Sequence, residues 1–438
     1  MKKIAFVSLG CPKNLVDSEN MLGALVSAGC EIISDESLAD VIIVNTCCFI
    51  NDAKQESIDA IIDVGQWKER GNCKKLIVTG CLAQRYKDEI IKELPEVDTV
   101  IGVGDVDGVV NAVMGDESGV SCDKPYELYC GGKRILTTPV YSAYLKVSDG
   151  CDNHCTYCVI PSIRGKLKSR TVEDCVSEAK ELVSNGVIEI VLLAQDLTNY
   201  GKDLYGEPRL VELLRELGKI DGLKWIRLLY CYPESITDEL IEEISRNDKI
   251  CKYIDIPVQH CNDEILKKMG RRGTKADIVS VVDKLRKKVF GITIRTTLIT
   301  GFPGETDEQY LEAEQFIRDM KFDRLGVFAY SQEENTPAAS MPCQIDEDVK
   351  LKRQEMLMFV QSEVAEELSM NKVGSLIEVL VEGYDPVVKQ YYGRSQADTM
   401  DIDAKIFFES KNKLEPGTFV NVRIEGFLDY DLIGKAED

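Results

Sequence analysis

Histidine is the scarcest of the metal-binding residue types in this 438-residue sequence, which contains only His154 and His260. So few imidazoles argue against a histidine-rich metal site and against acid–base chemistry driven by histidine. Basic residues are also few: 53 Lys plus Arg face 75 Asp plus Glu, for a formal net charge of −22. This field repels a polyanion and attracts a basic partner, whereas a nucleic-acid enzyme normally carries a basic surface. An acidic surface that only keeps the protein soluble is an equally good explanation.

Long hydrophobic runs are missing as well. The longest apolar stretches, such as VIIVNT at 41–46, have the length of strands, which predicts no membrane span. The opening MKKIAFVSLGCPKN has no apolar run long enough for a signal peptide, so we expect a cytoplasmic protein. In such a reducing compartment, sixteen cysteines indicate packing or metal binding rather than disulfides. Any metal is expected to bind thiolates, which favour zinc or iron–sulfur clusters.

Residues 1–115 alternate strand and helix patterns. Strands are predicted at 3–10, 40–46, 75–80 and 99–103, and helices at 18–29, at 50–67, after Arg85 and up to Met114. This alternation predicts parallel strands with helices on both faces, in a small flavodoxin-like doubly wound sheet. Residues 116–138 lose the periodicity and are predicted to form a linker with at most a hairpin.

Alternation resumes in residues 139–374, where six strand patterns are each followed by a helical one. The strands are predicted at 144–149, 188–194, 224–230, 253–259, 292–300 and 324–330. Six such units predict a partial (β/α)6 barrel with its reactive side at the C-terminal strand ends. A long helix then ends at Gly374. Residues 375–438 show short strands typical of a small all-β barrel, with 7 basic against 13 acidic residues.

Three cysteines share one loop in SDGCDNHCTYCVIPSIRG, at 148–165, where Cys151, Cys155 and Cys158 follow the first barrel strand. A structural zinc site needs four protein ligands, but no second CxxC pair is present, and Cys175 lies in a predicted helix. His154 directly precedes Cys155, an awkward place for a fourth ligand. A [4Fe–4S] cluster fits better, because three thiolates leave one iron open.

CDNHCTYC resembles the CxxxCxΦC motif of radical S-adenosylmethionine (SAM) enzymes, in which Φ is an aromatic residue and Tyr157 matches it. The resemblance implies that the open iron binds the amino and carboxylate groups of SAM. It also implies that an electron from the cluster cleaves SAM to methionine and a 5′-deoxyadenosyl radical, which removes an unactivated hydrogen. A partial (β/α)6 barrel is the fold that this superfamily implies, and it matches the six predicted units.

Three further cysteines, Cys11, Cys47 and Cys81, each follow a predicted parallel strand of the N-terminal domain. Doubly wound sheets bind ligands at that edge, so three loops about 35 residues apart are predicted to converge. Buried cysteines often serve only as small hydrophobic residues, but three at equivalent strand ends favour a shared site.

LGCPKNLVDSE, NTCCFINDA and TGCLAQRY resemble the N-terminal motifs of methylthiotransferases. The resemblance implies a second [4Fe–4S] cluster on Cys11, Cys47 and Cys81, which holds the transferred sulfur. Cys48 departs from the family pattern and could compete with Cys47 as a ligand. The other cysteines are expected to be packing or surface thiols: Cys30, Cys73, Cys122, Cys130, Cys175, Cys231, Cys251, Cys261 and Cys343.

Polar residues at the ends of the barrel strands match further segments of the same family. They are candidates for binding cofactor or substrate, with loop capping as the alternative: Gln195, Asp196, Gln259, His260, Arg295 and Glu305, together with Tyr157. Since a radical would accept the hydrogen, His260 is expected to donate or accept a hydrogen bond rather than act as a base. The basic MGRRG at 269–273 is expected to be a solvated loop.

The resemblance covers the whole chain, with a TRAM-like C-terminal domain. Family members modify either an adenosine in tRNA or the β-carbon of an aspartate in small-subunit ribosomal protein twelve. The acidic charge favours a basic ribosomal protein as the substrate. The segment GRSQADTMDID, at 393–403, resembles an acidic segment of the ribosomal-protein members. The predicted protein is therefore a radical SAM enzyme with two [4Fe–4S] clusters, a basic ribosomal-protein substrate and an external low-potential electron donor. The alternatives are tRNA methylthiolation and a non-catalytic iron–sulfur electron carrier.

Overall fold

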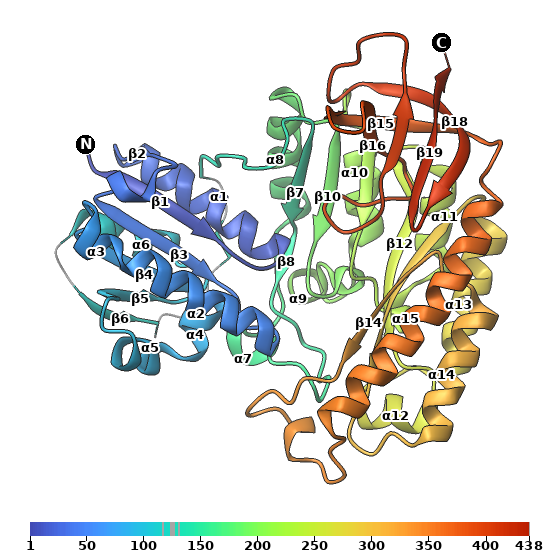
Figure 1. The fold of residues 1–438 in the computed structure, drawn as a ribbon, viewed down its shortest axis with the longest axis horizontal. Helices are drawn as coiled ribbons and strands as arrows, with labels where there is room; N and C mark the ends of the chain where they lie inside the picture. The colour runs from blue at the N-terminus through green and yellow to red at the C-terminus, as the bar shows by residue number, and fades with distance from the viewer. Residues whose placement is uncertain (116–117, 123–127, 130–131, 438) are drawn as a thin grey trace.

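A computed structural model describes residues 1–115, 118–122, 128–129 and 132–437. Cys130 lies outside the described residues. No helix among those described has the length and apolar character needed to cross a membrane. Two parallel sheets and a closed barrel make up the fold (Figure 1).

The first sheet is parallel, with the strand order β2-β1-β3-β4-β5-β6. Its strands are β1 (Lys3–Ser8), β2 (Glu31–Ile32), β3 (Val41–Thr46), β4 (Lys75–Gly80), β5 (Thr99–Ile101) and β6 (Gly119–Ser121). Its helices are α1 (Pro12–Ser27), α2 (Asn51–Gly65), α3 (Trp67–Arg70), α4 (Cys81–Arg85), α5 (Lys87–Glu93) and α6 (Val106–Met114). Alternate strand residues pack against α1 and α6 on one face and against α2, α4 and α5 on the other. The predicted doubly wound sheet is confirmed.

Three details of this domain differ from the prediction. Helix α1 begins at Pro12, six residues early, because proline suits the first helical position, where no amide hydrogen is needed. The helix predicted after Arg85 is α5, but it is preceded by α4, a five-residue helix that begins at Cys81 directly after β4 and was not predicted. Residues 119–121, expected within a linker, pair with β5 as a parallel strand, an assignment that three residues without alternation do not reveal.

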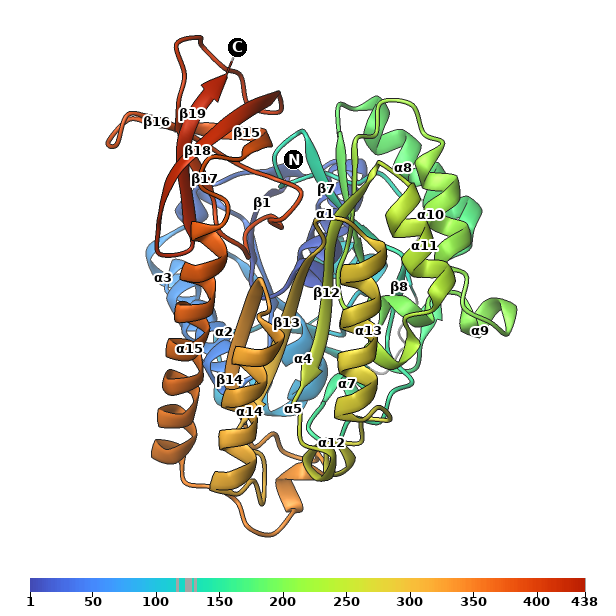
Figure 2. The same ribbon diagram turned by 90° about the vertical axis from the view of Figure 1, so that its right-hand side faces the viewer.

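The second sheet is also parallel, in the order β14-β13-β12-β11-β10-β7. Its strands are β7 (Ser142–Lys146), β10 (Glu189–Leu193), β11 (Trp225–Leu228), β12 (Ile250–Gln259), β13 (Thr293–Thr300) and β14 (Arg324–Ala329). The long helices are α8 (Val172–Ser184), α10 (Leu210–Gly218), α11 (Asp238–Arg246), α13 (Lys275–Lys288), α14 (Asp307–Met320) and α15 (Glu347–Met370). Six strands with helices along one face confirm the partial barrel (Figure 2).

Short elements occupy the connections of this domain. They are β8 (Ser148–Asp149), α7 (Ile160–Arg164), β9 (Lys168–Ser169), α9 (Lys202–Tyr205), α12 (Asp263–Lys268) and the 3-10 turns η2 (Leu197–Asn199), η3 (Pro233–Ser235) and η4 (Ala338–Ser340); η1 (Glu36–Leu38) belongs to the first domain. Helix α15 stops at Met370, and turns lead to Gly374, whose φ of +86° suits glycine.

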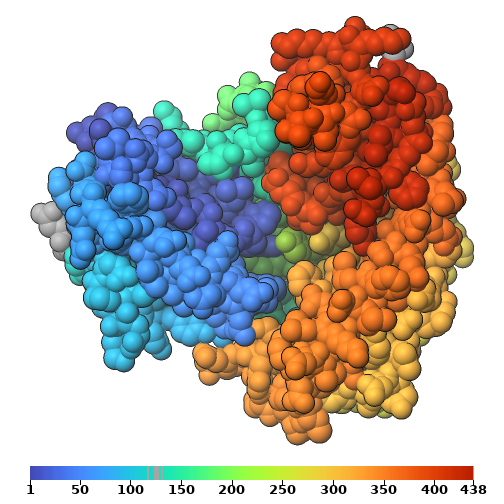
Figure 3. Space-filling view, in the orientation of Figure 1, coloured from blue at the N-terminus to red at the C-terminus, as the bar shows by residue number. Residues whose placement is uncertain are grey.

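The C-terminal residues form the predicted all-β barrel, closed in the order β15-β16-β17-β19-β18. Its strands are β15 (Leu376–Asp385), β16 (Gln390–Arg394), β17 (Ile406–Glu409), β18 (Phe419–Leu428) and β19 (Asp431–Glu437). The open face of the second sheet receives both flanking domains, since Val16 of α1 and Leu380 of β15 join its Leu193 and Trp225 in one buried cluster. Figure 3 shows a hollow between the N-terminal and C-terminal domains, with green to yellow atoms of the second sheet's domain at its floor.

A buried ion cluster fastens the C-terminal barrel to the second sheet. Glu189 of β10 accepts hydrogen bonds from Arg394 of β16 at 2.6 Å and from Arg227 of β11 at 3.0 Å. Arg227 also donates to the carbonyl of Gln396. Burial alone would raise the pKa of Glu189, but Arg394 and then Arg227 outweigh it and lower the pKa to about 2.

The Glu189→Gln variant is expected to be about 3 kcal/mol less stable than the wild type at pH 6. Because the pKa of Glu189 falls from 4.5 to about 2 on folding, its contribution is complete above pH 4.5 and is lost as the pH falls towards 2. Urea unfolding of the apoprotein from pH 6 to pH 2.5 should therefore show the difference shrinking. Glu415→Gln, an exposed control in the same barrel, should change stability by less than about 0.5 kcal/mol. A constant difference across this range would contradict the prediction.

Candidate active site between two cysteine triads

The first triad, Cys151, Cys155 and Cys158, lies in the loop between β8 and α7. The loop is held at both ends, because the Cys151 amide donates to the Gly165 carbonyl and the Thr156 amide donates to the Met269 carbonyl. Backbone amides of Asn153 and Ile160 point at the sulfurs of Cys151 and Cys158, at 3.4 and 3.5 Å. Amides placed in this way stabilise thiolate ligands.

Aromatic and basic side chains surround this first triad. The Tyr232 hydroxyl lies 3.6 Å from the Cys155 sulfur, and Tyr157 packs beside Phe302 and Tyr330. Burial raises the pKa of Cys151 to about 11 and that of Cys158 to about 12, as expected for thiols away from water. These thiols need a compensating cation to ionise, which a bound metal cluster provides.

The second triad, Cys11, Cys47 and Cys81, lies at the C-terminal edge of three adjacent strands. Cys11 caps α1 after β1, Cys47 follows β3, and Cys81 opens α4 after β4. A Cβ atom on Gly10 would lie 2.7 Å from the Cys47 Cβ, so the β1 and β3 loops touch where the cysteines stand. The predicted convergence of these loops is therefore observed. Burial raises the pKa of Cys81 to about 12.

Cys48 is fully buried in the core of the N-terminal domain, in the same cluster as Cys81 and residues of α2 and α4, whereas the neighbouring Cys47 approaches Gly10. Burial raises the pKa of Cys48, as it does for Cys47 and Cys81. The complete burial of Cys48 among apolar side chains favours a packing role for this thiol. Most other described cysteines are buried: Cys30, Cys73, Cys122, Cys175, Cys231, Cys251 and Cys261; Cys343 is exposed.

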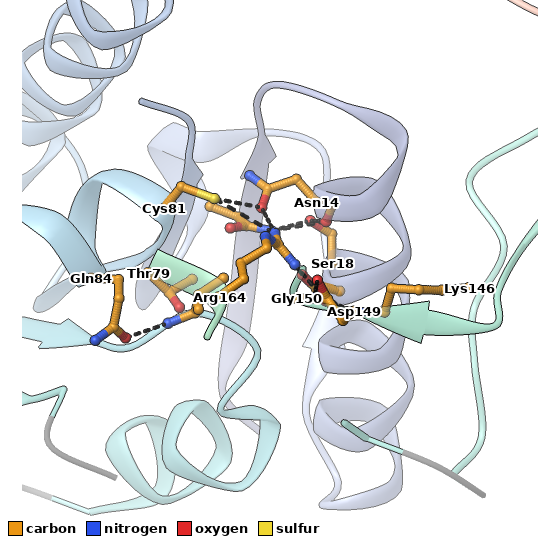
Figure 4. A network of polar contacts seen from close by, with 12 residues as sticks. Asn14, Ser18, Thr79, Cys81, Gln84, Lys146, Asp149, Gly150 and Arg164 are labelled. Atoms are coloured by element: carbon orange, nitrogen blue, oxygen red, sulfur yellow. Dashed lines mark hydrogen bonds and ion pairs between the residues drawn. The ribbon is translucent and has the colours of Figure 1, made fainter. Parts of the chain in front are cut away.

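One arginine connects the two triads. Arg164 ends α7, directly after the first triad, and its Nη2 lies 3.6 Å from the Cys81 sulfur of the second triad and 2.9 Å from Asn14 Oδ1. Its Nη1 lies 2.7 Å from Asp149 Oδ2 and 3.1 Å from Asp17 Oδ2. Figure 4 shows the guanidinium reaching from α7 to Cys81, Asn14 and Asp149. The N-terminal domain is thus joined to the first-triad loop through buried charge.

Lys146 completes this network by pairing with Asp17 and with Asp149. Sequence analysis did not select Arg164, Lys146, Asp17 or Asp149, although each lies in or beside a quoted motif. The feature of the sequence that could have identified them is a charged residue within an apolar strand or helix pattern, such as Lys146 in YLKVSD. Charged residues are rarely buried unless they are paired, so such a position predicts a buried ion pair.

A second lysine stands next to the second triad. Lys13 is in the first turn of α1, two residues after Cys11, and is only 7% exposed. Its Nζ lies 3.4 Å from the ring centroid of Tyr230, just past β11 of the second sheet. Burial lowers the pKa of Lys13 to about 8, although Cys11 and Asp149 act in the opposite direction.

The predicted strand-end residues have different surroundings. Gln195 donates to Asp149 at 2.5 Å, and Asp196 accepts from Asn153 of the first-triad loop at 2.7 Å. Both therefore support that loop. Gln259 ends β12 with a φ of +70°, and Arg295 pairs with Asp255 at 2.9 Å.

His260 and Glu305 are buried side by side, with His260 Nε2 3.5 Å from Glu305 Oε1, and neither of these two atoms has a hydrogen-bond partner among the described residues. The Asn262 amide donates to the other imidazole nitrogen, Nδ1, and Glu305 also pairs with Arg353. A hydrogen-bonding place for His260 agrees with the expectation. The expectation of a solvated MGRRG loop was wrong for Arg271, which is buried over the Tyr232 ring, 4.1 Å from its centroid.

Both donor sets fit iron–sulfur clusters. Each offers three thiols without an imidazole, and soft thiolates suit iron–sulfur chemistry. Amides, a tyrosine hydroxyl and Arg164 stand close to the sulfurs and can balance thiolate charge. Among the described residues, no three Cys, His, Asp or Glu side chains are arranged around a single metal ion.

Three family profiles match the chain. Residues 3–102 match the uncharacterized protein family UPF0004, residues 145–317 match the radical SAM superfamily, and residues 373–436 match the TRAM domain. In solved structures, the fold is similar to TsrM, a radical S-adenosylmethionine methyltransferase from Kitasatospora setae, with a TM-score of 0.57 and 14% identity. That match covers 86% of this chain and 78% of TsrM, and it concerns the fold alone.

Curated relatives match over the full length. The ribosomal protein uS12 methylthiotransferase RimO of Clostridium kluyveri is 49% identical over 445 aligned positions, which cover 100% of this chain and 98% of the relative. RimO of Clostridioides difficile is 50% identical, covering 99% of this chain and 98% of the relative.

Proposed function

This chain belongs to the family of ribosomal protein uS12 methylthiotransferases, and we propose that it transfers a methylthio group to the β-carbon of an aspartate in uS12. The observation that carries this proposal is the pair of cysteine triads joined by Arg164. A reaction that uses two cluster sites on one substrate carbon needs them on the same side of the molecule.

The cysteines of each triad are proposed as ligands of one [4Fe–4S] cluster. Cys151, Cys155 and Cys158 would hold the SAM-binding cluster, and Cys11, Cys47 and Cys81 the second cluster. When bound, the two clusters and SAM supply the electron, the hydrogen-abstracting radical, the sulfur and the methyl group. The protein's own residues hold the thiols in place, with amides directed at the sulfurs of the first triad.

Among the strand-end residues, Tyr157 and Gln259 are proposed to line the SAM site directly, since one packs beside the first triad and the other ends a central strand. Gln195 and Asp196 are proposed to position the loop, and His260, Arg295 and Glu305 to shape the surrounding strand ends. The hydrogen bonds of Gln195 and Asp196 and the polar contacts of the other three residues are consistent with these structural roles.

A polypeptide substrate agrees with the charge and shape of the molecule. The formal charge of −22 attracts a basic ribosomal protein and repels RNA. The hollow in Figure 3 lies between the N-terminal and C-terminal domains and offers a place for a substrate loop. We also propose a cytoplasmic location, where ribosomal proteins are made, and an external low-potential electron donor.

The deciding experiment is an anaerobic assay of the reconstituted, reduced enzyme with SAM and sulfide. A uS12 peptide containing the target aspartate and a substrate tRNA are offered in parallel, and both are examined by mass spectrometry. A methylthio mass gain on the peptide alone is expected. A gain on the tRNA alone would contradict the proposal and favour the adenosine-modifying activity. SAM cleavage by the reduced enzyme would rule out a simple electron carrier.

A further inference from the structure

The Lys13 ammonium group is buried, and among the residues that the structure describes it forms no ion pair with a carboxylate within 4 Å. Its Nζ lies 3.4 Å from the centroid of the Tyr230 ring. A ring face attracts a cation but does not replace a counter-ion, and a buried charge needs a partner.

The carboxylates nearest to Lys13 already have other partners. Asp149 pairs with Arg164 and Lys146, and Asp255 pairs with Arg295 while accepting the amide of Tyr230. Asp17 is shared between the same Arg164 and Lys146. The network therefore contains two carboxylates, on Asp17 and Asp149, and two cations, on Arg164 and Lys146. Both carboxylates are already paired, so neither is available as a separate partner for Lys13.

The location of Lys13 suits a ligand bound between the domains. It follows Cys11 of the second triad in the N-terminal domain, and its Nζ lies against the ring of Tyr230, just past β11 of the second sheet. In Figure 3, dark-blue atoms from the start of the chain form one wall of the hollow between the domains. An anionic group bound between the N-terminal domain and the second sheet would meet a cation held by an aromatic ring.

We propose that the Lys13 ammonium group binds the side-chain carboxylate of the target aspartate and so holds its β-carbon beside the second triad. This inference rests on the proposed function and names the group that recognises its substrate. Because the carboxyl carbon is bonded directly to the β-carbon, holding the carboxylate restricts the position of the β-carbon. It also predicts that an aspartate at the target position is bound more tightly than an asparagine.

A competing role for Lys13 is to balance the charge of cluster-bound thiolates, since Cys11 is close enough to affect it electrostatically. The two roles predict different results. An anchor changes the affinity for the substrate carboxylate, whereas a charge-balancing residue changes the iron content and electron paramagnetic resonance signal of the second cluster.

The test is a double-mutant cycle on the reconstituted enzyme without reductant, with peptide affinity as the readout. Wild type, Lys13→Met and Lys13→Arg are each titrated with the uS12 peptide and with the same peptide carrying asparagine at the target position. Wild type should bind the aspartate peptide about 10- to 100-fold more tightly than the asparagine peptide. Lys13→Met should lower this ratio to about one, and Lys13→Arg should retain part of it.

Lys74→Met serves as the matched control, because it removes an exposed lysine of the same domain and should leave the ratio unchanged. An unchanged ratio in Lys13→Met would overturn the proposal, and so would loss of iron or an altered cluster signal with the ratio preserved. Loss of the cluster together with the ratio would assign Lys13 to the cluster and overturn it as well. If wild type methylthiolates the tRNA and not the peptide, the proposed function itself has failed.

Discussion

Replacing Cys155 with alanine is expected to reduce SAM cleavage to background, whereas Cys47→Ala should retain cleavage and lose methylthiolation. Each change removes one thiolate from a set of three, and the two sets lie in different domains. The first-triad loop keeps its anchors in Cys47→Ala, because they come from Gly165 and Met269 rather than from the N-terminal domain. The same split is expected between the other members of each triad.

The measurements are 5′-deoxyadenosine formation, methylthiolated peptide and iron per protein chain, all under anaerobic conditions. Cys343→Ala is the surface control and should match the wild type in all three. Cys48→Ala is the more demanding control, because Cys48 adjoins Cys47 but lies in the core. It should lose some stability and keep both activities. Sulfur insertion by the Cys47→Ala variant would show that Cys48, and not Cys47, is the ligand. Loss of sulfur insertion in a Cys48→Ala variant of normal stability would show the same.

The Arg164→Met variant should be about 3 to 5 kcal/mol less stable than the wild type, because Asp17 and Asp149 would each lose a buried partner. The cation joins α7 to the N-terminal domain, so its loss should also loosen the attachment of the first-triad loop to that domain. We therefore expect methylthiolation to fall more steeply than SAM cleavage, which needs only the first triad.

Urea unfolding gives the stability of this variant, and the ratio of 5′-deoxyadenosine to methylthiolated peptide gives its coupling between the triads. Arg164→Lys keeps one positive charge but cannot reach Cys81, Asn14 and both carboxylates together, so intermediate values are expected. Arg423→Met removes an exposed arginine paired with Glu437 and should change stability by less than about 0.5 kcal/mol. Equal losses of both activities in Arg164→Met would show that the residue only stabilises the fold.

The acidic segment at 393–403 illustrates how structure changes the meaning of a charge pattern. From the sequence, its resemblance to a family segment favoured the ribosomal-protein members, and several of its charges are used internally. Asp398 pairs with Arg324 at 2.6 Å, and Asp403 accepts from the Tyr253 hydroxyl at 2.8 Å. These contacts attach the C-terminal barrel to the second sheet. The attraction for a basic partner therefore rests on the net charge of the whole chain rather than on this segment.

The elements were predictable where local periodicity is strong. Strands such as 41–46 and 75–80 are continuous apolar runs, because parallel strands are buried on both faces. The start of α1 was not predictable, because its first turn begins with a proline and carries little periodic signal. The strand at 119–121 was not predictable either, because only three residues pair with β5.

The sequence by itself determined which residues carry the chemistry. The cysteine spacings, the positions of the cysteines after strands and the excess of acidic over basic residues are all local or additive properties. Only the tertiary structure decided which charges meet. Asp17 and Arg164 are 147 residues apart, and Glu189 and Arg394 are 205 apart. No period in the chain links such pairs, because they are brought together by the packing of separate domains. The buried cations around the triads, Arg164 and Lys13, become visible only after that packing.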